Sequence, residues 1–299
     1  MRICACVVAA LAALAVGVRL WPRAPLRERV AGSTAVLDRE GGLLRLALAP
    51  DQTFRLWTPL ERISPLVVDA TLLAEDRHFR VHPGANPISL LRALRSAAGG
   101  GRRVGGSTLT MQLARRLYGI DSRTAGGKLA QIARAVQLEL EYSKHDLLEA
   151  YLNLAPYGGN VEGVAAASHV YFGKPAERLT LDEALLLAVI PKSPARRQPR
   201  DGAAPQALLD ARRALAERWI ALHPADAAVR EALLGPPVLH TVGELPFSAP
   251  HFADGVLARR PGGGAVRSTL DAPLQRLVED RLAAYVARRR SVGIRNAEL

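Results

Sequence analysis

The chain has 299 residues, 49% hydrophobic and only 5% aromatic, and its formal charge is +12 from 40 Lys+Arg against 28 Asp+Glu. This length is enough for one large or two ordinary domains, and the charge suits an anionic partner such as nucleic acid, anionic lipid or a pyrophosphate. Because the sequence has no zinc-finger spacing and no aromatic RNA-binding signature, nucleic acid is not expected. The only cysteines, Cys4 and Cys6, lie in the N-terminal apolar segment, which excludes a disulfide framework.

An uncharged apolar run covers residues 3–18. As a helix it is about 24 Å long, short of the roughly 30 Å hydrocarbon core, and tilt or Leu20 and Trp21 at the interface would supply the rest. An uncleaved signal anchor over residues 1–21 is favoured over a cleaved signal peptide. Four basic residues follow the run: Arg19, Arg23, Arg27 and Arg29. By the positive-inside rule, the chain after the run would then lie on the cytoplasmic side of the membrane.

Residues 22–57 are predicted to form a linker and two short strands, at 35–37 and 43–46, because short apolar runs are separated by glycines. From residue 65 to about 223 the apolar residues recur at helical spacing. The expected helices are 67–74, 88–98, 107–117, 128–140, 144–154, 181–189 and 208–222.

Local signals refine this pattern. Thr180, with Glu183 three residues later, predicts a capping box at the start of the helix 181–189. Residues 99–106 have the Gly- and Arg-rich composition of a mobile loop. Further along, the sequence predicts a proline-rich break at 191–205, an irregular stretch at 233–261, a strand at 266–271 and a helix at 275–288 entered through Asp271 and Pro273.

Glu75 and Asp76 stand near the end of the helix predicted at 67–74. A carboxylate beside an apolar wall has a raised pKa and can act as a general base. Taken alone, a Glu-Asp pair is more often a solvated pair on a surface helix. The motifs around and after this pair decide between the two interpretations.

Several motifs follow one another in a fixed order. Residues 75–84 fit E-D-x-x-F-x-x-H-x-G, and residues 105–115 fit G-G-S-T-[IL]-T-x-Q-x-x-[KR]. Tyr142-Ser143-Lys144, Tyr151-Leu152-Asn153, Tyr171-Phe172-Gly173-Lys174 and Pro191-Lys192-Ser193-Pro194 come next. From about residue 58 to 215 the chain resembles the peptidoglycan glycosyltransferase (family 51) module of penicillin-binding proteins, in particular the branch of penicillin-binding protein 1C.

The resemblance implies a mainly α, lysozyme-like glycosyltransferase fold with an N-terminal transmembrane helix, a membrane-embedded small lobe and a small α+β C-terminal linker region. It divides the chain into an anchor (1–21), a linker with short strands (22–57), the glycosyltransferase domain (58–222) and a linker toward an absent transpeptidase domain (223–299). It also implies a location in the bacterial inner membrane, single-pass, with the catalytic domain in the periplasm. That side conflicts with the one that the four arginines favour.

The resemblance implies polymerisation of lipid II. The 4-hydroxyl of the incoming lipid II attacks the anomeric carbon of the growing glycan with inversion, and undecaprenyl pyrophosphate leaves. The implied partners are lipid II, the nascent glycan strand, the membrane and cell-wall synthesis proteins. Mg²⁺ or Mn²⁺ is the family expectation for a cofactor, and no organic cofactor is expected.

The motif positions carry expected roles. A sugar hydroxyl is a weak nucleophile, so a carboxylate must take its proton; Glu75 is the expected base, with Asp76 as the alternative or as a positioning group. Cations or a metal stabilise the leaving pyrophosphate. Arg115, Lys128 and Arg134 are the candidates, and a solvated surface position is as good an interpretation of Arg134. The other expected substrate or pyrophosphate contacts are Phe79, His82, Gly84, Ser107, Thr108, Gln112, Gln131 and Asn153. Of these, Phe79 and His82 could equally shape the turn, and Ser107 and Thr108 could cap a helix.

The sequence departs from the family pattern at two positions. Gln131 stands where most members have a second catalytic Glu, and a glutamine cannot donate a proton as an acid. If the family's Glu acts by binding, Gln131 can take its place, and the 1C branch, which has the same Gln, supports this. If that Glu is an acid or a metal ligand, we expect weak activity or transfer of its role to another residue, for instance Glu139. Met111, where many relatives have Gln, implies a change of contact only.

Residues 266–275 resemble the linker that leads into a penicillin-binding transpeptidase domain. The sequence has no S-x-x-K and no K-T-G motif, so no acylation by β-lactams is expected. Two other functions remain open: a lysozyme-like glycan hydrolase, which also uses carboxylates in a helical fold, and a catalytically weak lipid-II-binding scaffold, which Gln131 would fit.

Overall fold

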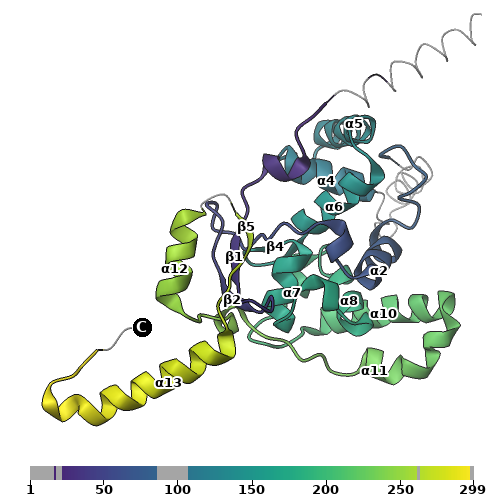
Figure 1. Ribbon diagram of the computed structural model, residues 1–299. Helices are drawn as coiled ribbons and strands as arrows, with labels where there is room; N and C mark the ends of the chain where they lie inside the picture. The colour runs from purple at the N-terminus through teal and green to yellow at the C-terminus, as the bar shows by residue number, and fades with distance from the viewer. Residues whose placement is uncertain (1–16, 18–21, 86–106, 261–262, 297–299) are drawn as a thin grey trace, which may run out of the picture.

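The computed structural model describes residues 17, 22–85, 107–260 and 263–296 (Figure 1). The chain is mainly helical, as predicted. Its helices are α2 (Pro65–Glu75), α4 (Leu109–Leu117), α5 (Ala125–Glu141), α6 (Lys144–Leu154), α7 (Val164–Phe172), α8 (Leu181–Val189), α9 (Pro194–Arg197), α10 (Gln206–Leu222), α11 (Arg230–Leu234), α12 (Pro250–Arg259) and α13 (Ala272–Arg289).

Three predicted segments fall outside the described residues: nearly all of the apolar run at 3–18, the helix at 88–98 and the loop at 99–106. Within the residues that are described, none of the helices combines the length and the apolar character needed to cross a membrane.

Two groups of packed helices make the core. The α8 helix is apolar nearly all round and packs against α2 and α10, while α4 packs against α5 and α6. The capping box predicted at the start of α8 is confirmed, since the Thr180 N–H donates to Glu183 Oε2 over 2.9 Å. The C-terminal end of α2 and the N-terminal end of α4 meet between the two groups, and this junction positions the candidate site.

The two predicted N-terminal strands are confirmed as β1 (Thr34–Leu37) and β2 (Leu43–Leu46), which pair antiparallel. The strand predicted at 266–271 is β5 (Gly264–Arg267), which starts two residues earlier and pairs with β1 in parallel, giving the sheet order β2-β1-β5. The segments before and after the helical part of the chain therefore meet in one sheet. A second, two-stranded ribbon is formed by β3 (Pro156–Gly158) and β4 (Val161–Glu162).

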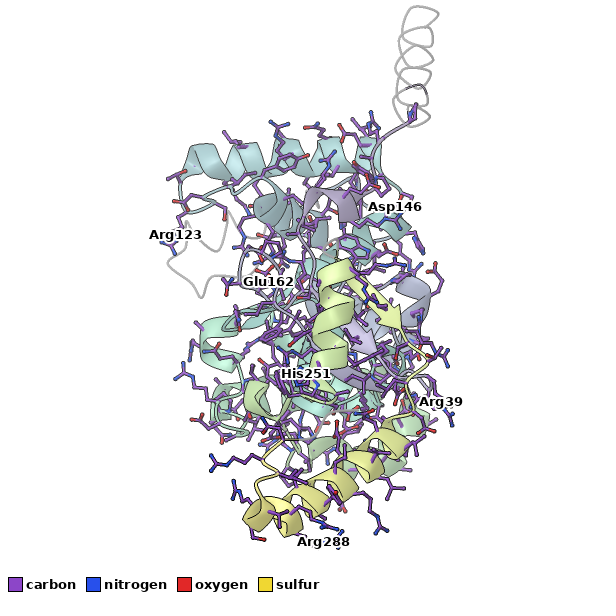
Figure 2. All side chains as sticks on the ribbon, turned by 60° about the vertical axis from the view of Figure 1, so that its left-hand side comes forward. Arg39, Arg123, Asp146, Glu162, His251 and Arg288 are labelled. Carbon is purple, nitrogen blue, oxygen red and sulfur yellow. The ribbon has the colours of Figure 1, made fainter. Side chains whose placement is uncertain are left out.

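The prediction of an irregular stretch at 233–261 is wrong over α12. Pro250 opens this helix, its Ala253 is fully buried, and the helix lies beside β1, so tertiary packing forms a helix that the local sequence does not announce (Figure 1). In α13 the side chain of Asp271 accepts the Leu274 N–H over 3.0 Å, which starts the helix three residues earlier than expected. Figure 2 shows Arg288, on α13, at the opposite end of the molecule from Arg123, just before α5.

An ion cluster that sequence reasoning missed joins the first linker to the helices. The buried Arg55 donates through Nε and Nη2 to Glu162 Oε2 over 3.0 and 2.6 Å, and Nη2 also lies 3.0 Å from Asp51. Arg116 on α4 pairs with the other oxygen of Glu162. The chain before α2 is thus held against the β4 strand and α4 by charge as well as by apolar packing.

We expect Arg55→Ala to lower the free energy of unfolding by about 3 kcal/mol, because it leaves the mostly buried Glu162 with one cation fewer. The matched control is Arg62→Ala, which removes the exposed 3.4 Å pair with Glu177 and should cost less than about 1 kcal/mol. Urea unfolding measures both. Equal losses of unfolding free energy in the two variants would show that the buried ion cluster stabilises the fold no more than an exposed ion pair does.

Candidate active site

One buried carboxylate holds the junction between α2 and α4. Asp76 directly follows α2, and its Oδ2 accepts the backbone N–H of Leu109, the first residue of α4, over 2.9 Å. The same oxygen lies 2.8 Å from Nε2 of the buried His82. Both contacts fall on Oδ2 of Asp76, which favours the positioning role that the sequence left open over that of a base.

The turn after Asp76 is shaped by residues that the sequence placed among the substrate contacts. Phe79 is buried, and Gly84 has a φ of +93° with its missing Cβ only 2.8 Å from the backbone of Ala135, so only glycine lets α5 approach this closely. The Thr108 hydroxyl donates to Gly84 O over 2.5 Å and accepts the Met111 N–H over 3.1 Å, which makes Thr108 the N-cap of α4. Through these contacts, four residues that were expected to bind substrate shape the turn and the start of α4: Phe79, His82, Gly84 and Thr108.

Glu75, the last residue of α2, is the carboxylate with capacity to react. Its Oε2 accepts a hydrogen bond of 2.9 Å from Gln112 Nε2 on α4, and its Oε1 is buried with no hydrogen-bond partner among the described residues. Burial raises the pKa of Glu75; the Gln112 bond and the charges of Lys192 and Arg197 oppose this rise, and Asp76 adds to it. The result is a carboxyl group with a raised pKa and one oxygen available to accept a proton.

A lysine from α5 is anchored beside the start of α4. Lys128 Nζ donates to Ser107 Oγ and to Gln131 Oε1, each over 2.8 Å, and Gln131 Nε2 donates to Met111 O over 2.6 Å. Gln131 thus holds Lys128 with one end and the α4 backbone with the other. A glutamate there would set a carboxylate oxygen against the Met111 carbonyl in this geometry, so the amide is the matched group.

Arg115 completes this cluster on the exposed side of α4, about one turn after Gln112. Burial, and secondly the charge of Arg115, lowers the pKa of Lys128. Charges on α2 and on α4 both act on the buried hydroxyl of Tyr151. Burial and then the charge of Glu75 raise the pKa of Tyr151, while the charge of Arg115 lowers it. The three charged residues are linked through α4: its Gln112 donates to Glu75, its Met111 carbonyl accepts from Gln131, which accepts from Lys128, and the helix itself carries Arg115. No role was predicted for Tyr151.

Three other candidates lie elsewhere. Asn153 is fully buried and its amide pairs with Thr58 N–H over 2.7 Å and Thr58 O over 2.8 Å, so the predicted substrate contact is corrected to a structural role. Arg134 is exposed, donates to Gln137 over 2.6 Å and lies over the ring of Tyr118 at 4.8 Å, as the surface interpretation expects. Glu139 Oε1 accepts from both Thr110 and Lys144, which gives this carboxylate a structural task.

Sequence reasoning missed a set of cations on the other side of Glu75. Lys192, Arg197 and Arg218 line a pocket of about 160 Å³ together with Glu75. Lys192 stands in a recognised motif, Pro191-Lys192-Ser193-Pro194, but nothing local assigns it to this carboxylate, and the two arginines belong to no motif.

The Mg²⁺ or Mn²⁺ that the family resemblance implies stays a prediction. Within residues 22–85, 107–260 and 263–296, no three His, Cys, Asp or Glu side chains come together in a way that could hold a metal ion. Oδ2 of Asp76 is taken by Leu109 and His82, and besides Asp76 the charges that act on Glu75 are the cations Lys192 and Arg197. Positive side chains suit a phosphate better than a cation.

Comparison with known proteins identifies the family to which the chain belongs. The family model described as Transglycosylase matches residues 43–219. The chain belongs to the transglycosylase family. Penicillin-binding protein 1C of Escherichia coli (strain K12) is 37% identical to this transglycosylase over 268 residues, which are 88% of this chain and 33% of the relative. Penicillin-binding protein 1A of Aquifex aeolicus (strain VF5) is 40% identical over 146 residues, 48% of this chain and 20% of the relative.

The transglycosylase chain thus spans about a third or less of the length of these relatives. The predicted resemblance to the family is confirmed. A crystal structure of penicillin-binding protein 1A from Haemophilus influenzae aligns with 87% of this chain and 30% of its own, at 18% identity and a TM-score of 0.39. The family assignment rests on the sequence matches.

In this transglycosylase we expect Asp76→Ala to cost about 2 kcal/mol or more in unfolding free energy, since it leaves the buried Leu109 N–H and His82 Nε2 unpaired. Asp69→Ala removes an exposed carboxylate from the same helix and serves as the control, with a change of at most about 0.5 kcal/mol. Chemical denaturation compares them. Similar stabilities of the two variants would contradict the role of Asp76 as the junction.

The raised pKa of Glu75 makes the stability of the transglycosylase depend on pH. A carboxyl group whose pKa is higher in the folded than in the unfolded state stabilises the fold below the unfolded pKa, and this contribution is lost as pH rises through the folded pKa. Glu75→Gln, which keeps an acceptor for Gln112, should therefore melt higher than the wild type at pH 7. The difference should vanish below about pH 4, under the unfolded pKa.

Melting temperatures between about pH 3 and pH 8 test this expectation. Glu231→Gln, at an exposed position on α11, is the control and should follow the wild type at every pH. A difference between Glu75→Gln and wild type that stays constant with pH would mean that ionisation of Glu75 does not act on stability.

Proposed function

We propose that this chain is a peptidoglycan glycosyltransferase that polymerises lipid II into glycan strands and releases undecaprenyl pyrophosphate. The observation that carries the proposal is Glu75: a carboxylate with a raised pKa and one unpaired oxygen, beside Gln112 and linked through α4 to Arg115 and Lys128. Membership of the transglycosylase family supports the reaction class, and the mainly helical fold is compatible with the lysozyme-like architecture of such enzymes.

The proposed step begins at Oε1 of Glu75. This oxygen takes the proton of the 4-hydroxyl of the incoming lipid II, and the hydroxyl oxygen forms a bond to the anomeric carbon of the growing strand. The bond from that carbon to the lipid pyrophosphate breaks, and the pyrophosphate leaves with the electron pair. A base whose pKa lies above that of an ordinary carboxylate accepts a proton more readily near neutral pH.

Lys128 and Arg115 are the proposed partners of the departing pyrophosphate. Two of the three Lys128 donors are used by Ser107 and Gln131, which fix the ammonium group and leave the third for a ligand. Because pyrophosphate is stable as an anion, it needs compensating charge and no proton from an acid. On this proposal Gln131 suffices, and a divalent cation would be carried by the pyrophosphate and not by a set of side chains.

The same geometry weighs against the two alternatives. A glycan hydrolase needs a pair of working carboxylates. Asp76 is engaged by Leu109 and His82, and position 131 carries an amide, so the described part of the site supplies one such group, Glu75. A binding scaffold has no need for a buried carboxylate with an unpaired oxygen, which costs stability.

The α5 end of the molecule is the proposed membrane side. Three apolar side chains, Leu129, Val136 and Leu140, are exposed along α5. Arg23 donates to Glu141 O over 3.3 Å and Arg29 to Tyr142 Oη over 2.8 Å, so the chain after the N-terminal run is tied to the end of α5 (Figure 1). Two of the four arginines that follow the apolar run, Arg23 and Arg29, thus have structural partners in the folded domain. Their positions are therefore weaker evidence about which side of the membrane they occupy.

On this basis we propose a single N-terminal anchor in the bacterial inner membrane, with the catalytic domain in the periplasm, where lipid II would reach the site from the bilayer. Leu129 and its neighbours would then lie at the lipid surface. Cell-wall synthesis proteins are also proposed as partners, and this proposal is supported only by the proposed function.

Incubation of the purified protein with labelled lipid II and Mg²⁺, followed by gel separation, tests the function. Glycan ladders are expected from the wild type and from the control Asp69→Asn, an exposed site on α2. Glu75→Gln should slow polymerisation by about 10²- to 10⁴-fold, the usual contribution of a general base. Undiminished ladders from Glu75→Gln would refute the assignment of the base. Shortening of preformed glycan would support the hydrolase, and binding without conversion the scaffold.

A further inference from the structure

Glu75 occupies a position that disfavours a negative charge. It is the last residue of α2, where the unpaired backbone carbonyls of a helix carry a partial negative charge, and the last turn of α2 contains no basic residue. Asp76 follows directly and is a second carboxyl group. A proton-abstracting base must nevertheless be ionised, so a compensating positive charge has to come from other elements.

The pocket of about 160 Å³ beside Glu75 supplies three such charges from three different elements. Lys192 lies in the loop after α8, Arg197 on α9 and Arg218 on α10, and the side chains of all three line the pocket with Glu75. Cations that converge on one half-buried carboxylate favour its ionised form.

The three cations differ in how firmly they are held. Arg218 donates to the backbone carbonyl of Leu73 over 2.5 Å and so neutralises the end of α2 itself. Lys192 is exposed, and water screens its charge. Arg197 is half-buried, and its Nη1 donates to Val189 O over 2.7 Å, which fixes the guanidinium at the pocket wall. Of these three cations, Arg197 is therefore the one that is fixed at the pocket wall and whose charge also acts on Glu75.

The energetics of Arg197 agree with this placement. Burial lowers the pKa of the Arg197 guanidinium, and the charge of Glu75 opposes that change, so each group compensates the desolvation of the other. A guanidinium remains charged in proteins, so Arg197 keeps its charge over the whole pH range of the proposed reaction.

We propose that Arg197 is a positioning residue that holds the Glu75 carboxylate in the ionised form needed to take the proton of the acceptor hydroxyl. The inference rests on the proposed function and deepens it, because it assigns to α9 the task of keeping the base ready. The titratable and charged groups that face Glu75 from the surrounding elements are Asp76, Tyr151, Tyr157, Lys192, Arg197 and Arg218.

Few of these groups would change charge between pH 5 and pH 9. Burial raises the pKa of both Tyr151 and Tyr157, which stay neutral in this range, and the arginines stay protonated. Lys128, whose pKa is lowered, is present in the wild type and in every variant, so the difference between the profiles of the wild type and Arg197→Gln reports on Glu75. Loss of Arg197 should make the Glu75 proton harder to remove, which moves the acidic limb of the activity profile to higher pH.

The test compares Arg197→Gln, Arg197→Lys and the matched control Arg196→Gln, which removes the same charge from the exposed neighbouring residue. Polymerisation of labelled lipid II is measured from pH 5 to pH 9. For Arg197→Gln we expect a rate about three- to tenfold below wild type at pH 6 and within about twofold at pH 9, since alkaline pH ionises the base without help. Arg197→Lys and Arg196→Gln should follow the wild-type profile.

A ¹³C NMR titration of the Glu75 carboxyl without substrate gives a second readout, in which Arg197→Gln should move the midpoint to higher pH. An equal loss of rate at every pH would reveal a merely structural role. A shift as large in Arg196→Gln would reveal a general effect of net charge, and either result would overturn the proposal. If the wild type made no polymer, the proposed function would fail, and the NMR midpoint would still decide whether Arg197 governs Glu75.

Discussion

The carboxylate of Asp76 is the constraint on which the candidate site depends. By accepting the Leu109 N–H and contacting His82, it joins the end of α2 to the start of α4 and fixes the turn between them. Glu75 is carried by one of these helices and Gln112 by the other, so their hydrogen bond follows from that junction. Two adjacent carboxylates thereby differ: Oδ2 of Asp76 accepts the Leu109 N–H and contacts His82, whereas Oε1 of Glu75 is buried with no hydrogen-bond partner among the described residues.

The site also reconciles burial with charge. Glu75 has to be desolvated to be a better base than a surface carboxylate, yet desolvation and its place at a helix end both favour the neutral form. Cations from the segment between α8 and α10 oppose this on one side, while Lys128 and Arg115 occupy the other side. On the proposed function, positive charge is thus divided between keeping the base ionised and receiving an anionic leaving group.

Local signals in the sequence predicted much of this structure. The capping box of α8, the helices α6 and α10 and the pairing of β1 with β2 depend on residues a few positions apart, which a pattern reveals. The role of Asn153 was misjudged because a motif does not tell whether a side chain faces a ligand or the interior. Arg197 and Arg218 were missed because their meaning depends on where α9 and α10 pack, which is a property of the tertiary structure.

The parallel pairing of β1 with β5 has a consequence for how the protein is made. The ribosome delivers β1 near the start of synthesis, but its partner emerges only after every helix from α2 to α12 has been translated. Contacts so distant along the chain close late and slowly, since a long loop must be ordered before they form. Until then one edge of β1 is open to other strands, and the nascent polypeptide passes through a stage in which mispairing competes with completion of the sheet.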